Sequence, residues 1–157
     1  MIVMLIRNAK TGDVGAIHSL IQSYAELDRM LFRSLADIYE SLQLFEVAEV
    51  DGQVAGCCAV GVVWSDLAEI RSLAIGNGFV GKGIGKALVE SALERCRNLG
   101  LGRVFTLTLE PDFFTHIGFR VIAKENLPMK VWRDCAKCCK QDACDEVALL
   151  YDLGAHQ

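Results

Sequence analysis

Apolar residues recur along the chain at two spacings, and the two spacings alternate from one segment to the next. At residues 14–24 and 84–92 they fall three or four positions apart, which is typical of one buried face of a helix. Elsewhere they gather in short β-rich runs, which are typical of strands. The strands are expected at residues 2–7, 45–50, 53–63, 67–75, 103–109, 119–122 and 146–153. Helices and strands that alternate with short connections predict one mixed α/β domain over residues 1–157.

Three short polar motifs mark where these elements begin or turn. Thr11 precedes the first helix and is expected to be its N-cap. Ser34, followed by Asp37 three residues later, is typical of a capping box at the start of a second, shorter helix. The Asp51-Gly52 pair between two β-rich runs predicts a tight hairpin at that point.

Composition and charge narrow the classes of function. The formal net charge is −4, which gives no hint of the positive face that a nucleic-acid-binding protein needs, so no nucleic-acid partner is expected. A local anion pocket stays open, because net charge says little about one cleft. No apolar run approaches the roughly 18 residues needed to cross a bilayer, so no membrane partner is expected. Seven cysteines, an odd number with two adjacent pairs, make a poor disulfide framework and favour a reducing cytoplasm.

The stretch VGKGIG, residues 80–85, places three glycines just before the second long helix. Glycines between a strand and a helix let backbone N–H groups converge on an anion at the positive end of the helix. No Gly-Lys-Ser/Thr ends this stretch, and its spacing does not fit G-x-G-x-x-G, so neither nucleotide-binding motif is indicated. On spacing alone, a phosphate site and a flexible loop both stay open.

Residues 69–85 resemble the acetyl-coenzyme A motif of the GCN5-related N-acetyltransferase (GNAT) superfamily. Gly83 and Gly85 match its two small positions, and Val80 departs at its first position. The resemblance extends to the acetyltransferase domain of bacterial N-acetylglutamate synthases. It is carried by the segments IRNAKTGDVGAIHSLI, MLFRS, AEIRSLAI, RVFTLT, FFTHIGF and LPMKVW. It implies an α/β (α+β) GNAT fold, in which a mixed, mostly antiparallel central sheet carries helices on both faces.

The length adds one expectation to this resemblance. Larger synthases of this kind carry an amino-acid-kinase-like domain in front, and 157 residues leave no room for one. A freestanding acetyltransferase domain is therefore expected. A homodimer through the late strands is common in the superfamily, and the sequence leaves the oligomeric state open.

The resemblance also implies acetyl-CoA as cosubstrate and a set of residues that bind it. The pyrophosphate would lie on the amides of residues 81–86, the N–H of Leu73 would polarise the acetyl carbonyl, and the main chain of Ile75 would pair with the pantetheine arm. Phe114 stands where many family members carry a tyrosine that protonates the leaving thiolate, and the resembled synthases also have phenylalanine there. Other proton donors weighed for that step are Tyr24, Thr108 and His116. The full expected set is Leu73, Ala74, Ile75, Gly81, Lys82, Gly83, Ile84, Gly85, Lys86 and Phe114.

Glu69 is the candidate general base. It falls at the position from which many family members take the proton of the attacking ammonium, often through a water molecule. Since side chains alternate along a strand, Glu69, Arg71 and Leu73 are expected to share one face. An ordinary salt-bridged glutamate is the alternative interpretation from the residues alone.

L-Glutamate is the expected acceptor, and arginine is the side chain suited to hold its carboxylates bidentately. Arg71, Arg33 and, more weakly, Lys130 are the candidate ligands. One departure concerns the segment that enters the last strand: it is basic in the resembled synthases and contains Asp145 and Glu146 here. The alternatives are therefore another amine acceptor (a different amino acid, a polyamine or a protein N-terminus) and a non-catalytic module that binds acetyl-CoA or senses a metal.

The segment CAKCCKQDAC gathers four cysteines within ten residues. Cys135, Cys138 and Cys144 are candidate ligands of a structural zinc ion, since zinc thiolates often come in Cys-x-x-Cys pairs. A disulfide or redox-sensitive loop and unliganded thiols are the alternatives. Cys57, Cys58 and Cys96 fall within strand and helix patterns and are expected to be buried as small hydrophobic side chains.

Overall fold

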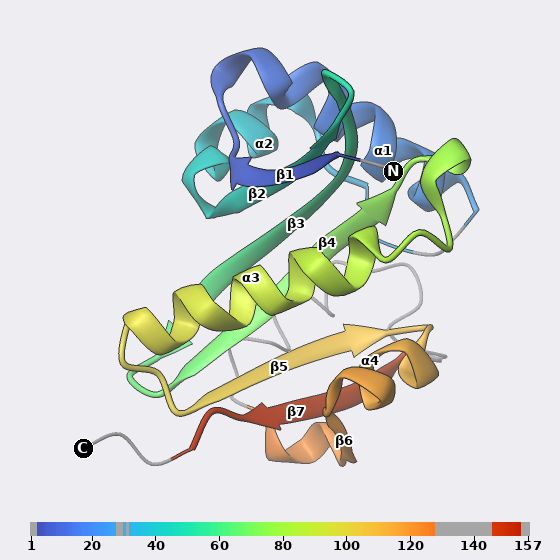
Figure 1. Cartoon of the computed structure of the whole chain (residues 1–157). Coiled ribbons are helices and arrows are strands. Elements are labelled where there is room, and N and C mark those ends of the chain that lie inside the picture. Colours follow the sequence, from blue (N-terminus) through green and yellow to red (C-terminus); the bar gives the residue numbers. More distant parts are fainter. Residues whose placement is uncertain (1–2, 28–29, 31, 128–145, 155–157) are drawn as a thin grey trace.

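The protein folds around a seven-stranded sheet in the order β1-β2-β3-β4-β5-β7-β6 (Figure 1). This computed structural model describes residues 3–27, 30, 32–127 and 146–154. The strands are β1 (Met4–Asn8), β2 (Phe45–Val50), β3 (Gln53–Trp64), β4 (Leu67–Ile75), β5 (Arg103–Thr108), β6 (Arg120–Ile122) and β7 (Val147–Asp152). The α-helices are α1 (Val14–Glu26), α2 (Leu35–Glu40), α3 (Ile84–Asn98) and α4 (Pro111–Ile117). The predicted fold class, a mostly antiparallel sheet with helices on both faces, is confirmed.

The sheet opens between its two central strands. Every pair of neighbours is antiparallel except β4 and β5, which are parallel. Their pairing covers only Leu67 to Ile70 of β4, opposite Arg103 to Thr106 of β5. Beyond that point β4 continues to Ile75, and the two strands diverge (Figure 1). The second half of β4 therefore presents a strand edge that β5 does not cover.

Three apolar clusters are found among the described residues, and the two larger ones lie on opposite faces of the sheet. Cys57 and Cys58 are neighbours on β3, so their side chains point to opposite faces, and each is buried in a different core. Cys58 and Cys96 pack on the side of α3, whereas Cys57 packs on the side of α1. Burial raises the pKa of Cys57 to about 12 and that of Cys96 to about 11. All three cysteines are buried, as the sequence predicted, and all three are free thiols.

The start of α1 is held by an ion-pair network rather than by a threonine cap. The prediction that Thr11 is the N-cap is wrong, because Thr11 begins a short 3-10 turn that ends at Asp13. The Asp13 carboxylate accepts two hydrogen bonds from the Arg7 guanidinium, at 2.7 and 3.0 Å, and one from the N–H of Lys10 at 2.7 Å. Arg7 also donates to Glu49 on β2 at 3.1 Å. This network fixes α1 to the edge of the sheet.

We expect Asp13→Asn to lower the free energy of unfolding at neutral pH by about 1.5–3 kcal/mol, since a charge-assisted bidentate pair is lost. The Arg7 guanidinium holds the pKa of Asp13 below its usual range. The stabilisation is therefore present above the unfolded pKa of about 3.9 and disappears as the pH falls through the lowered pKa.

Urea unfolding at pH 7 and pH 3 checks this prediction. The control is Asp66→Asn, which removes an exposed pair with Arg103 and is expected to cost under about 1 kcal/mol. An Asp13→Asn deficit that stays the same at both pH values would contradict the assignment.

Two other local predictions are confirmed. The Asp37 N–H donates to Ser34 Oγ at 3.1 Å, and the Ser34 N–H donates back to the Asp37 carboxylate at 3.3 Å, which is a capping box. Asp51 and Gly52 both have positive φ, as a tight hairpin turn between β2 and β3 requires.

Several expectations concern residues outside the described ranges. Lys130 and the cysteine cluster with Cys135, Cys138 and Cys144 lie there, so the zinc hypothesis has no counterpart in the described part of the chain. Among the described residues, no group of three or more His, Cys, Asp or Glu side chains is arranged to hold a metal ion. In the same residues, no helix has the length and apolar character needed to cross a membrane.

Candidate active site

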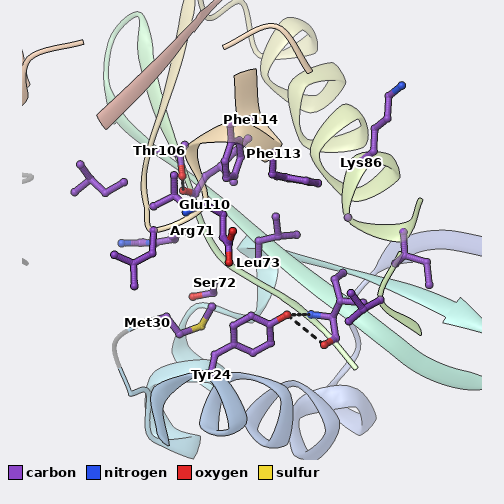
Figure 2. A pocket seen from close by; sticks show the side chains of 18 of the residues that line it. Tyr24, Met30, Arg71, Ser72, Leu73, Lys86, Thr106, Glu110, Phe113 and Phe114 are labelled. Carbon is purple, nitrogen blue, oxygen red and sulfur yellow. Dashed lines mark hydrogen bonds between the residues drawn. The ribbon is translucent and has the colours of Figure 1, made fainter. Parts of the chain in front are cut away.

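A cleft of about 490 Å³ lies where β4 and β5 part. Its walls come from α1, the second half of β4, the start of α3, the end of β5 and α4. At the point of separation, the Thr106 hydroxyl donates to the Ile70 carbonyl at 2.9 Å, directly across the last paired position. In Figure 2, Tyr24 and Met30 lie on one side of this space and Phe113 and Phe114 lie on the other.

The N-terminus of α3 forms one end of the cleft. Gly81 and Gly83 have φ values of +81° and +82°, a left-handed conformation that glycine adopts without steric cost. Gly83 is the N-cap, and the first helical hydrogen bond runs from the N–H of Ala87 to the Gly83 carbonyl at 3.1 Å. The N–H groups of the first helical residues, Ile84, Gly85 and Lys86, therefore have no acceptor within the helix. All three residues line the cleft, where the positive end of the helix favours an anion.

Gly85 is small for a different reason. A Cβ at this position would lie 3.1 Å from the nearest ring atom of Phe113, which is closer than side chains normally approach. Phe113 in turn packs edge-on against Phe114 with ring centroids 5.0 Å apart. The glycine thus allows α4 to approach the first turn of α3 and close the apolar wall of the cleft.

A bulge in β4 changes which face of the sheet its later side chains point to. Ser72 has a φ of +57°, and the register shifts there so that Ser72 and Leu73 oppose the single residue Cys58 of β3. Leu73 therefore packs with the core on the α3 side. The prediction that Leu73 shares a face with Glu69 and Arg71 is wrong, because this extra residue rotates the rest of the strand.

Glu69 and Arg71 do lie together on one face. An Arg71 guanidinium nitrogen is 3.7 Å from the Glu69 carboxylate, and the two side chains are 12% (Glu69) and 30% (Arg71) exposed. Gly61 on β3 makes room for the guanidinium, since a Cβ there would be 3.3 Å from an Arg71 nitrogen. The pair places a carboxylate and a cation side by side within the cleft.

The open edge of β4 is occupied at Ile75. The N–H of Gly76 donates to Ala55 on β3 at 2.8 Å, so the N–H of Ile75 points the other way, toward the cleft. There it donates to the Tyr24 hydroxyl at 3.1 Å, and this hydroxyl donates to the Ile75 carbonyl at 3.3 Å. Both bonds are drawn in Figure 2.

Most of the predicted site residues meet at this cleft. Those that line it are Arg33, Glu69, Arg71, Leu73, Ile75, Gly81, Gly83, Ile84, Gly85, Lys86 and Phe114. Two predicted residues do not line the cleft: Ala74, which is fully buried toward α1, and Lys82, which is exposed. The end of the Lys86 side chain points away from the centre of the cleft (Figure 2). Of the proton donors weighed for the thiolate, Tyr24 and Thr108 line the cleft, whereas His116 is exposed on α4.

The cleft also contains residues that the sequence did not single out. They include Met30, Phe79, Thr106, Glu110 and Phe113. Phe113 could have been found from the sequence, because it is next to the predicted Phe114 on the same short helix. Glu110 and Met30 lie in connecting segments, where no periodic pattern of apolar residues indicates a position in the cleft. Glu146, expected to reverse the local charge at the entry to the last strand, does line the same cleft.

One cleft thus combines an open strand edge, a helix N-terminus that favours an anion and a carboxylate paired with a cation. Residues 13–119 match the acetyltransferase (GNAT) family, and the chain belongs to this family. It is an N-acetyltransferase.

Two relatives with similar sequences and one solved structure show what this chain is similar to. An uncharacterised N-acetyltransferase of Chlorobaculum tepidum is 45% identical over 94% of this chain and 96% of its own length. An amino-acid acetyltransferase of Mycobacterium tuberculosis is 40% identical over 96% of this chain and 80% of its own. The crystal structure of N-acetylglutamate synthase from Neisseria gonorrhoeae, complexed with coenzyme A and N-acetyl-glutamate, superposes with a TM-score of 0.88 at 26% identity. That alignment covers 98% of this chain and 36% of the synthase chain.

Proposed function

We propose that this protein transfers the acetyl group of acetyl-CoA to the α-amino group of a small amino acid, with L-glutamate as the first candidate. The single observation that carries the proposal is the Glu69–Arg71 pair, 3.7 Å apart, inside a cleft that also contains the N-terminus of α3. The relatives named as amino-acid acetyltransferase and N-acetylglutamate synthase support the same reaction class. The product would then enter arginine biosynthesis in the cytoplasm.

The donor would occupy the long axis of the cleft. The backbone N–H groups of residues 81–86 would hold the pyrophosphate. All of these residues except Lys82 line the cleft, and Gly81 and Gly83 adopt left-handed conformations without a side chain that would block the anion. Lys82 and Lys86 would add positive charge nearby. The pantetheine arm would pair with the open edge of β4 at Leu73 and Ile75, as an added strand pairs with a sheet edge.

Glu69 would act as general base. It would take a proton from the acceptor's ammonium group, directly or through one water molecule, so that the amine nitrogen can attack the thioester carbonyl. The N–H of Leu73 would stabilise the oxygen on which negative charge develops. The carbon–sulfur bond then breaks, the sulfur leaves with the electron pair, and the nitrogen loses its second proton to the departing thiolate or to water, which gives the amide and free coenzyme A. Phe114 has no proton to give, and a thiolate is a tolerable leaving group near neutral pH without a dedicated acid.

Arg71 and Arg33 would hold the acceptor. Both line the cleft, and a guanidinium matches a carboxylate with two parallel hydrogen bonds. Lys130 would contribute a weaker contact. Arg71 lies beside Glu69, which would place an α-carboxylate next to the base and orient the amine toward it.

A second acceptor class is favoured by two carboxylates in the same cleft, Glu110 and Glu146. A γ-carboxylate close to them would be repelled, whereas a side-chain amide could donate hydrogen bonds to them. An amino acid with an uncharged amide side chain, such as L-glutamine, is therefore the second candidate.

The test incubates the protein with acetyl-CoA and one acceptor at a time, and it detects the acetylated product by mass spectrometry. The acceptors are L-glutamate, L-glutamine, other amino acids, a polyamine and a peptide with a free N-terminus. Mass spectrometry avoids thiol-detecting dyes, with which seven protein cysteines would react. We expect the highest kcat/KM with glutamate, then with glutamine. Acetylation of the polyamine or peptide alone would contradict the amino-acid assignment, and coenzyme binding without any product would favour a non-catalytic module.

Glu146→Gln tests which part of the acceptor lies near this carboxylate. We expect the ratio of kcat/KM for glutamate to kcat/KM for glutamine to rise about fivefold. Two negative charges about 4 Å apart in water repel each other by about 1 kcal/mol, and the substitution removes this repulsion between Glu146 and the γ-carboxylate of the acceptor. Glu125→Gln, an exposed glutamate that does not line the cleft, is the matched control. An unchanged ratio in Glu146→Gln would place the acceptor side chain elsewhere.

A further inference from the structure

The Tyr24 hydroxyl hydrogen-bonds to the main chain of Ile75, at the strand edge where the proposed function places the pantetheine arm. The inference below rests on that proposed function. The hydroxyl accepts from the Ile75 N–H at 3.1 Å and donates to the Ile75 carbonyl at 3.3 Å, so one side chain satisfies both groups. This is the same pair of groups that a neighbouring strand or a pantetheine amide would use.

Tyr24 and the coenzyme arm compete for one position. The Ile75 N–H has a single hydrogen, and the phenol oxygen already lies within hydrogen-bond distance of it. An amide oxygen that took this hydrogen at about 2.9 Å would overlap the hydroxyl. The two bonded states of Ile75 are therefore mutually exclusive.

We propose that Tyr24 is a positioning residue whose hydroxyl keeps the edge of β4 closed until the pantetheine amide displaces it. Without coenzyme, the hydroxyl stands in for the missing strand at the point where β5 has diverged. With coenzyme, the C=O of one pantetheine amide and the N–H of the other take over the two groups of Ile75, and the phenol moves aside.

This exchange links the donor to the acceptor end of the cleft. Tyr24 and Met30 pack against the same core on the α1 side, and Figure 2 shows them next to each other at the cleft. Arg33 lines the cleft a few residues further along the chain. Moving the Tyr24 ring therefore changes the wall beside the proposed acceptor ligands.

The experiment measures the Kd of coenzyme A by titration calorimetry for the wild type and for Tyr24→Phe. The variant keeps the ring and its packing and removes only the hydroxyl. We expect coenzyme A to bind roughly fivefold more tightly to Tyr24→Phe, because no protein hydrogen bonds to Ile75 have to be broken first. Tyr39→Phe, an exposed tyrosine on α2, is the matched control and should bind as the wild type does.

The sign of the change separates the alternatives. Weaker binding in Tyr24→Phe would mean that the hydroxyl supports the coenzyme or the fold, and unchanged binding would mean that it does not compete; either result overturns the proposal while the proposed function stands. No binding of coenzyme A to the wild type would overturn both. A second readout is amide hydrogen exchange at Ile75, which should accelerate in free Tyr24→Phe and slow again when coenzyme A is added.

Discussion

Glu69→Gln is expected to lower kcat by about 10²–10⁴-fold while leaving the Kd of coenzyme A unchanged. The glutamine keeps the size of the side chain and can still contact Arg71, but it cannot take a proton from the acceptor's ammonium group. The loss should be largest near neutral pH and should shrink as the pH rises toward the pKa of that ammonium, because a deprotonated amine no longer needs a base. Steady-state kinetics with product detection by mass spectrometry, between pH 6.5 and 10, measures both effects.

The control for this prediction is Glu94→Gln. Glu94 is also paired with an arginine, Arg97, at 3.2 Å, but it lies exposed on α3 outside the cleft. It should retain wild-type activity. Two results would contradict the assignment of Glu69 as general base: full activity of Glu69→Gln, or a loss of kcat that has the same size at every pH.

The second large effect is expected at the glycine turn before α3. Gly83→Ala should weaken the binding of coenzyme A at least tenfold, since a residue with a Cβ pays about 1–2 kcal/mol to adopt the left-handed conformation that the N-cap has here. To avoid this cost the turn must change, and the N–H groups of Ile84 to Lys86 then lose their common direction.

Gly78→Ala is the matched variant in the same connection. Gly78 has no heavy atom within 4 Å of a built Cβ and does not have a positive φ, so the substitution should leave coenzyme binding unchanged. Titration calorimetry compares the two variants. Equal affinities in both would contradict a role for the turn at Gly83 in holding the phosphates.

The sequence predicted those parts of the site that depend on residue type or on spacing. Glycine at position 83 is needed because of its backbone conformation, and the alternation of side chains along β4 correctly placed Glu69 beside Arg71. The capping box at Ser34 and the hairpin at Asp51 were also predictable, since each depends on a few adjacent residues.

The features that the sequence missed depend on contacts between distant segments or on one backbone angle. Ser72 adopts a positive φ that no residue pattern signals, and this bulge turned Leu73 to the other face. Gly85 was assigned to the phosphate loop, although its lack of a side chain is also explained by the approach of Phe113 from α4. The bond between Tyr24 and Ile75 joins residues 51 positions apart and could not be derived from either segment.

The central claim is that backbone amides at the start of α3 and on the open edge of β4 hold the donor, and amide hydrogen exchange measures such groups directly. With coenzyme A added, we predict slower exchange at residues 81–86 and at Leu73. The N–H groups of Ile84 to Lys86 have no acceptor within α3 until the ligand provides one, and Leu73 lies on the part of β4 that β5 does not cover. Binding of coenzyme A that leaves exchange at these residues unchanged, and slows it elsewhere, would contradict the account.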